Sequence, residues 1–198
     1  LLGLVVAGRD GFVAHLDKSG LPQSAMRLGG PGDDRLHALA VAPDGAFVIA
    51  GTHDGLDLGA GVLPHTPGAH DGFLAAFDPG GALRWSEAGF VLAHDASALA
   101  LTADGALVAA LPVGGAVIDL GDARLPGAPG LLLVHIAPDG RLTWARRIEG
   151  TLAPTFGLAA GAARIAVAGA FDATLSHGGD LLQSAGEFDV FAGLLRLP

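Results

Sequence analysis

The sequence predicts an all-β fold, and specifically a β-propeller of four-stranded antiparallel blades. Three observations lead to this prediction. Short apolar runs alternate with turns along the whole 198-residue chain. The 32 Gly and 12 Pro residues recur between those runs, where they permit tight turns. The pattern also repeats, and an internal repeat of about four strands is typical of propellers.

The first half of each unit is a pair of apolar runs joined by a small turn. Residues 36–50, 96–110 and 154–168 align in this way. The first two copies contain VAPDGAFVIA and LTADGALVAA, whereas Ala162 and Ala163 replace the Asp-Gly turn in the third. We expect these runs to form strands a and b of each unit.

The second half of each unit is another hairpin, which contains strands c and d. Residues 73–85 (FLAAFDPGGALRW) match residues 132–144 (LLVHIAPDGRLTW), and their final tryptophans are 59 residues apart. The N-terminal region carries a further copy at residues 12–21. Residues 188–195 match strand c, and the chain stops soon after them.

We expect strands rather than helices because Asp-Gly, Gly-Gly or Ser-Gly pairs bound the apolar runs. Gly and Asp accept the positive φ that tight hairpin turns require. No window shows a sustained helical apolar period with capping residues. The abundant Ala and Leu favour helix, but a short helix between Gly turns cannot recover its nucleation cost.

A propeller explains the apolar pattern better than a sandwich does. Strands a, b and c are almost continuously apolar, as at residues 107–111 and 131–134, so both of their faces need cover. Each blade of a propeller lies between two others, which supplies that cover. Strand d alternates instead, and we expect Leu83 and Trp85 to face one way and Arg84 the other, as on a partly solvated outer strand.

We treat residues 1–198 as one propeller domain with a partial unit at each end. The units are approximately 1–30 (partial), 31–89, 90–149 and 150–198 (partial). The chain therefore either closes as a ring of about four blades or forms an excerpt of a larger ring. The linker at residues 51–70 has room for a small extra hairpin at residues 56–64.

Composition excludes several classes of function. The net charge is −9 and Lys and Arg total only 11, so we expect no nucleic-acid partner, because phosphate backbones bind basic surfaces. No apolar run reaches the roughly 20 residues of a spanning helix, so we expect no membrane span. The chain has no Cys, which removes disulfides, thiolate metal sites and cysteine nucleophiles.

Three segments of the chain are similar to one bacterial repeat family. They are residues 29–51 (GGPGDDRLHALAVAPDGAFVIAG), 57–63 (DLGAGVL) and 71–85 (DGFLAAFDPGGALRW). They resemble the SBBP repeat, a seven-bladed-propeller-type repeat, in the Gly- and Ala-rich form found in secreted or lipid-anchored proteins of myxobacteria and relatives. The resemblance is closest over residues 10–89 and faintest over 150–198, where the Asp-Gly turn is absent. It implies a propeller, an extracellular or cell-envelope location and a binding role, and it implies no catalytic residues.

Histidines and aspartates gather in the linker between strands b and c of the first full unit. His53, His65 and His70 are the candidates for a metal site there, since imidazole binds Zn²⁺ and similar ions. Their spacing matches no compact metal motif, and the aligned linkers lack these residues. We therefore expect solvated loop histidines, no metal and no cofactor.

Aspartates also recur in the turns. Asp44, Asp104 and Asp139 each precede Gly, and we predict a turn role for them. A Ca²⁺ site would need several oxygens converging on one loop, and each of these loops has one Asp.

Other polar and aromatic residues recur at fixed positions of the unit. His15 and His135 share one position of strand c, which we interpret as a polar strand face. Trp85 and Trp144 share a position in strand d. They could stack on a sugar, but their regular place favours packing between blades.

These patterns predict a non-enzymatic secreted or cell-surface module for protein interaction or scaffolding. The alternative is a propeller lectin, or another small-ligand-binding module, with sites between blades. A third reading is a quinoprotein-like enzyme, because residues 139–144 (DGRLTW) are similar to the repeats of those proteins. The sequence shows no basic, carboxylate-lined pocket for such a cofactor.

Overall fold

The computed structural model of the chain describes residues 9–66, 71–93, 97–120, 123–161, 163–177 and 179–196. Every regular element within these ranges is a β-strand and every pairing is antiparallel, which confirms the all-β prediction. The strands are β1 (Gly11–Leu16), β2 (Pro22–Leu28), β3 (Arg35–Val41), β4 (Phe47–His53), β5 (Asp71–Phe77), β6 (Leu83–Val91), β7 (Ala98–Leu101), β8 (Leu107–Gly114), β9 (Ile118–Leu120), β10 (Ala123–Leu125), β11 (Pro129–Ile136), β12 (Leu142–Ala160), β13 (Arg164–His177), β14 (Asp180–Gln183) and β15 (Asp189–Arg196).

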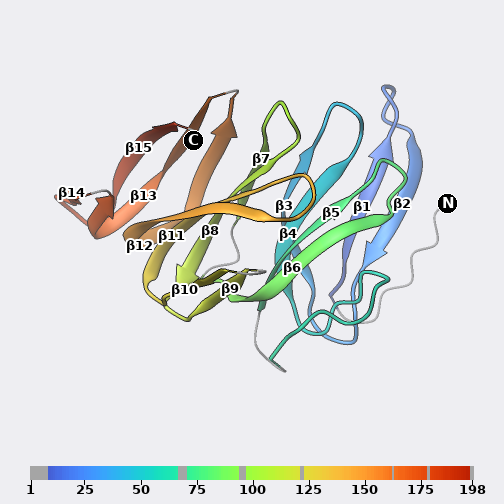
Figure 1. The fold of residues 1–198 in the computed structure, drawn as a ribbon, viewed down its shortest axis with the longest axis horizontal. Helices are drawn as coiled ribbons and strands as arrows, with labels where there is room; N and C mark the ends of the chain where they lie inside the picture. Colours follow the sequence, from blue (N-terminus) through green and yellow to red (C-terminus); the bar gives the residue numbers. More distant parts are fainter. Residues whose placement is uncertain are drawn as a thin grey trace.

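The strands form an N-terminal hairpin, a four-stranded sheet, a seven-stranded sheet and the small β9–β10 hairpin (Figure 1). The seven-stranded sheet consists of two parts that share the long strand β12, and these parts are called the second and third sheets below. The hairpin is β1–β2, and the first sheet is β3–β4–β5–β6 in that order. The second sheet is β7–β8–β11 with the first half of β12. The second half of β12 pairs with β13, which also pairs with β15, and these strands are the third sheet. β12 runs for 19 residues, so strand d of one predicted unit and strand a of the next are one continuous strand.

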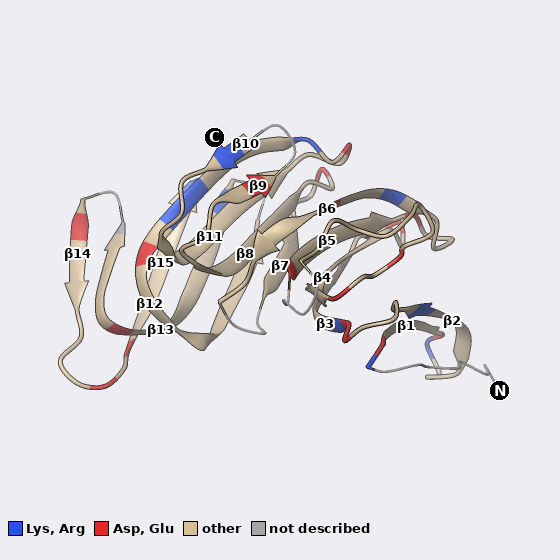
Figure 2. Cartoon of the chain, turned by 90° about the horizontal axis from the view of Figure 1, so that it is seen from below, with Lys and Arg blue, Asp and Glu red and all other residues tan. Residues whose placement is uncertain are grey.

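The sheets stack face to face (Figure 2). An apolar cluster fills each interface between them. Leu28 and Phe73 belong to the cluster between the N-terminal hairpin and the first sheet. Leu74 and Leu132 belong to the cluster between the first and second sheets. Leu133, on the opposite face of the second sheet, belongs to the cluster that reaches the third. Both faces of β4, β5, β8 and β11 are therefore covered, as their continuous apolar runs predict.

Strand a is not covered on both faces, so the prediction that strands a, b and c are all covered on both faces is wrong for strand a. β3 and β7 are mostly half-buried, and Leu39 and Val41 of β3 are exposed. The physical reason is position, since β3 and β7 each lie at an edge of the sheet and pair on one side only.

Five hairpin turns share one backbone geometry. The fourth residue of each is a glycine whose φ lies between 81° and 92°, and its N–H donates to the carbonyl three residues earlier at 2.9–3.0 Å. These glycines are Gly20, Gly45, Gly81, Gly105 and Gly140. Only glycine adopts the positive φ here, while the aspartates contribute hydrogen bonds. Asp44 and Asp139 accept the N–H two residues on at 3.0 and 3.1 Å, and Asp104 accepts the Thr102 hydroxyl. The turn role predicted for these aspartates is confirmed.

A β-bulge follows the turn in each c–d hairpin, and it changes the side of the sheet on which the next side chains of strand d lie. Ala76 pairs with Trp85 and Phe77 pairs with Leu83, so Arg84 has no partner across the ladder. An extra residue shifts the side-chain alternation by one position. Leu83 therefore packs toward the N-terminal hairpin and Trp85 toward the second sheet. The prediction that these two side chains face the same way is wrong.

Each of the three sheets carries a small extra hairpin between its second and third strands. In the first sheet Asp57 bridges Val62, and the Leu63 N–H donates to the Leu56 carbonyl at 2.8 Å, as predicted for residues 56–64. The second sheet has β9–β10 in this place, and the third has β14 paired with the end of β13.

The N-terminal hairpin and the third sheet lie at opposite ends of the molecule (Figure 1). The described strands thus form an open row of sheets rather than a closed ring. Within these same residues, no helix is long and apolar enough to cross a membrane.

Candidate functional site

The predicted histidine candidates lie at the end of β4, where the first sheet meets its extra hairpin. His53 is 0% exposed, and its ring packs edge-on against Phe73 at 5.7 Å between centroids. Its Nδ1 accepts the Leu56 N–H at 3.3 Å, while its buried Nε2 has no hydrogen-bond partner among the described residues. The expectation of a solvated loop histidine is therefore wrong for His53, because the adjacent hairpin folds over it.

His65, the second candidate, lies beside His53. The two rings are 6.0 Å apart, and His65 Nε2 lies 3.9 Å from an oxygen of Asp54. Within the part of the chain that the structure describes, no three His, Asp or Glu side chains are placed to hold a metal ion. His70, the third candidate, lies outside the described residues.

The carboxylates around His53 hold backbone groups. Asp34 is buried and accepts the N–H groups of Gly30 at 2.6 Å and Asp54 at 3.2 Å, which ties the β2–β3 connection to the end of β4. Asp71 is buried and accepts the Thr66 N–H. Both carboxylate oxygens of Asp34 and one oxygen of Asp71 thus fix backbone groups around His53.

Burial lowers the pKa of His53 below its ordinary value of 6.5. Asp34 and Asp71 act in the opposite direction, and His65 lowers it further, but burial is the largest cause. The imidazole is therefore neutral in the folded protein at neutral pH, and its role is that of a buried structural acceptor.

This lowered pKa predicts that the protein loses stability in mild acid. As the pH falls below about 6.5, the unfolded chain takes up a proton on His53 and the folded chain resists it, so the free energy of unfolding decreases. We expect His53→Asn, which keeps an acceptor for the Leu56 N–H, to flatten this slope between about pH 7 and pH 5. Urea unfolding at a series of pH values measures the slope of the unfolding free energy against pH. His15→Asn, at an exposed position of β1, is the control; an equal slope in wild type and His53→Asn would contradict the assignment.

The tryptophans pack between sheets, as predicted. Trp85 joins the cluster between the first and second sheets and lies over the Gly140 turn, where an added Cβ would be 2.8 Å from the indole. Trp144 packs against the cluster that reaches the third sheet and stacks on His135 at 5.5 Å. His135 also hydrogen-bonds the Thr143 hydroxyl, and burial lowers its pKa, so its polar position on the strand is used structurally.

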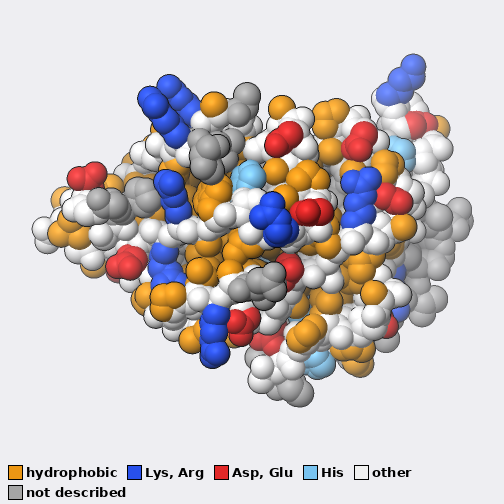
Figure 3. All heavy atoms as spheres, in the orientation of Figure 1, with side chains coloured by type: hydrophobic (Ala, Val, Ile, Leu, Met, Phe, Trp, Pro, Cys, Tyr) orange, Lys and Arg blue, Asp and Glu red, His pale blue; other side chains and the backbone are white. Residues whose placement is uncertain are grey.

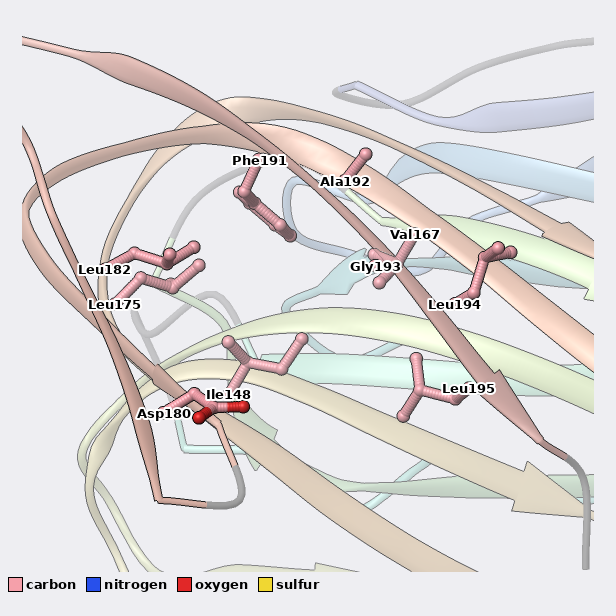
Figure 4. A pocket seen from close by; sticks show the side chains of 10 residues that line it. All are labelled: Ile148, Val167, Leu175, Asp180, Leu182, Phe191, Ala192, Gly193, Leu194 and Leu195. Carbon is pink, nitrogen blue, oxygen red and sulfur yellow. The ribbon is translucent and has the colours of Figure 1, made fainter.

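An apolar pocket of about 240 Å³ runs along β15 in the third sheet (Figure 4). Phe191 and Leu195 of β15 line one side, Leu175 and Leu182 line another, and Ile148 lies at the base. Asp180 is the one charged side chain in the lining. The pocket therefore suits an apolar group rather than a polar substrate.

The pocket lies beside an open edge of the third sheet. In the first two sheets the third strand, β5 or β11, pairs with a fourth strand, β6 or β12. β15 is the equivalent third strand, and among the described residues it pairs with β13 alone. No described strand pairs with its outer edge, and an unpaired strand edge is a template for another strand.

Sequence reasoning named no residue of this pocket. The available signal was the copy of strand c at residues 188–195, which is β15. The pocket also needs Leu175 and Leu182 of the β13–β14 hairpin, which no pattern placed beside β15.

Charged side chains are dispersed over the face of the molecule drawn in Figure 3. On the face in Figure 3, Lys and Arg are interspersed with Asp and Glu and form no broad basic area.

Comparison with models of known protein families gives no match to this chain, and comparison with curated proteins gives no match either.

Proposed function

We propose that the chain is a non-enzymatic β-propeller-type repeat module, exported to the cell surface or the medium, that binds a protein partner. The propeller reading is supported by the repeated order of four strands and by the apolar clusters on both faces of the first two sheets. The resemblance to SBBP repeats supports export. The buried carboxylates and histidine described above serve the fold, which favours binding over catalysis.

The observation that carries a binding role is the open edge of β15 above its apolar pocket. The first and second sheets indicate the kind of ligand. In each of them a fourth strand with apolar side chains, β6 or β12, pairs with the edge that corresponds to the outer edge of β15. In the second sheet Leu142 and Ala145 of that strand pack into the adjoining interface. The partner would therefore be an extended protein segment that adds a strand to the sheet and places apolar side chains in the pocket.

A strand peptide tests this proposal. We expect a fluorophore-labelled peptide of β6 (LRWSEAGFV) to bind the purified chain, and a version with Pro in place of Ala88 to bind more weakly, because Pro lacks the N–H. We expect Leu182→Glu to weaken binding about ten-fold or more, since Leu182 lines the pocket. Fluorescence anisotropy measures both effects.

The matched control is Leu181→Glu. Leu181 is adjacent on β14 and exposed, but it does not line the pocket, so this variant is expected to bind like the wild type. Equal loss in both variants, or no difference between the two peptides, would count against strand addition at β15.

A glycan is the second candidate ligand. A groove between the first and second sheets is lined by Trp85 and Arg84 together with Asp44 and Asp104, a combination of aromatic and polar groups that can hold a sugar. Binding on a glycan array that is lost in Arg84→Ala would favour the lectin reading. A chromophore in the purified protein would instead favour the quinoprotein-like reading.

A further inference from the structure

The two outermost faces of the row of sheets are apolar and exposed. The C-end face is the outer surface of the third sheet, where Val190 and Leu194 of β15 are 86% and 71% exposed. Ala166 and Ala168 of β13 lie on the same side of this sheet, opposite Leu194 and Ala192 in the ladder. The N-end face is the outer surface of β1, where Phe12 is 64% exposed and Leu16 is 51% exposed.

The C-end face is the repeat equivalent of faces that are covered elsewhere in the chain. Val48 and Ala50 of the first sheet face the second sheet. Val108 and Ala110, at the same repeat positions, face the third. Ala166 and Ala168 are the next copies of these positions, and they face outward.

The N-end face is the repeat equivalent of the faces that contact the preceding sheet elsewhere in the chain. Phe73 of β5 faces the preceding N-terminal hairpin, and Leu132 of β11 faces the preceding first sheet. Phe191 of β15 likewise faces the preceding second sheet. Phe12 occupies this position in β1, and no described sheet precedes it.

The two free faces therefore match as front and back of one repeated interface, but they lie at opposite ends of the molecule (Figure 1). We propose that a second copy of this chain binds head to tail, with its N-end face on the C-end face of the first. This contact uses the outer surface of the third sheet, which adjoins the strand-binding edge proposed above, because Leu194 also lines the β15 pocket. A contact of this kind is heterologous, and it either closes into a ring or continues as a chain of copies.

Charge at the turn end of the two faces supports this partner. Arg164 and Arg196 are exposed and lie directly opposite each other in the ladder, where like charges repel. Asp17 occupies the position after Leu16 that Arg196 occupies after Leu195. Hydrogen bonds from Ser19 and Leu21 lower the pKa of Asp17 and keep it ionised. Stacked sheets lie about 10 Å apart, so head-to-tail docking brings this carboxylate near both arginines.

The test uses two variants of the full chain that each block one face. Val190→Glu with Leu194→Glu blocks the C-end face, and Phe12→Glu with Leu16→Glu blocks the N-end face. Sedimentation velocity over a range of concentrations should show association of the unaltered chain. Each blocked variant alone should stay monomeric, and their equimolar mixture should form a one-to-one dimer and nothing larger. Val117→Glu, at an exposed position away from both faces, should associate like the unaltered chain.

Three results would overturn the proposal. They are an unaltered chain that stays monomeric at every attainable concentration, a blocked variant that dimerises by itself, and a mixture that stays monomeric. If a Glu variant fails to fold, a pair of single cysteine variants replaces it. The chain contains no Cys of its own, so the introduced thiols are the only ones that can form a disulfide. Phe12→Cys and Leu194→Cys should form a disulfide with each other under mild oxidation in preference to either homodimer. Homodimers alone would exclude head-to-tail docking.

Discussion

Phe73→Ala is expected to lower the free energy of unfolding by about 4 kcal/mol, the largest effect of any single substitution considered for this chain. Phe73 is 1% exposed and lies at the centre of the cluster that joins the N-terminal hairpin to the first sheet. Its ring also contacts the buried His53 edge-on. Removing the ring leaves a cavity that rigid strands on both sides cannot close. Urea unfolding, followed by circular dichroism, measures the loss.

The repeat supplies a matched control for this prediction. Phe12 occupies the same repeat position in β1 but is exposed, so Phe12→Ala should change the unfolding free energy by less than about 0.5 kcal/mol. The comparison is made at the lowest practical protein concentration, so that self-association does not contribute. An equally small change in both variants would show that the N-terminal hairpin does not cover Phe73 in solution.

Gly51→Ala is expected to destabilise the protein by about 3 kcal/mol, at the upper end of the usual cost of overpacking. Gly51 lies in β4 between Leu36 of β3 and Phe73 of β5. An added Cβ would lie 2.0 Å from the Arg35 carbonyl oxygen and 2.7 Å from the Phe73 ring. One of these neighbours is backbone, so the clash is relieved only if β3 moves away from β4. Thermal and urea unfolding both measure the change.

Gly157→Ala is the counterpart of this substitution. Gly157 also lies within a strand, β12, but nothing is within 4 Å of the Cβ that alanine would add. Alanine should be neutral or stabilise by about 0.5 kcal/mol, because it reduces the freedom of the unfolded chain. A large loss at Gly157, or none at Gly51, would contradict the strand packing described here.

The fold was predictable wherever local chemistry decides it. The Gly at the fourth position of each turn and the apolar runs on either side placed the hairpins correctly, because a positive φ is a property of the glycine itself. The extra hairpin near Leu56 and Leu63 and the packing role of Trp85 were also predictable, since both follow from the repeat.

Other features depend on partners that the sequence pattern does not name. Leu83 and Trp85 face opposite ways because a bulge in the ladder intervenes, and bulges are set by pairing with β5. His53 is buried because a hairpin folds over it, although its neighbours in the sequence are polar. The β15 pocket requires Leu182 to approach from another hairpin.

By itself the sequence determined that this chain is built of short antiparallel strands in repeated hairpins, because turn geometry and apolar runs act over a few residues. Only the tertiary structure decided which faces and edges are left uncovered. Burial is a property of what packs against a strand, and that depends on sheets whose residues are far apart in the chain.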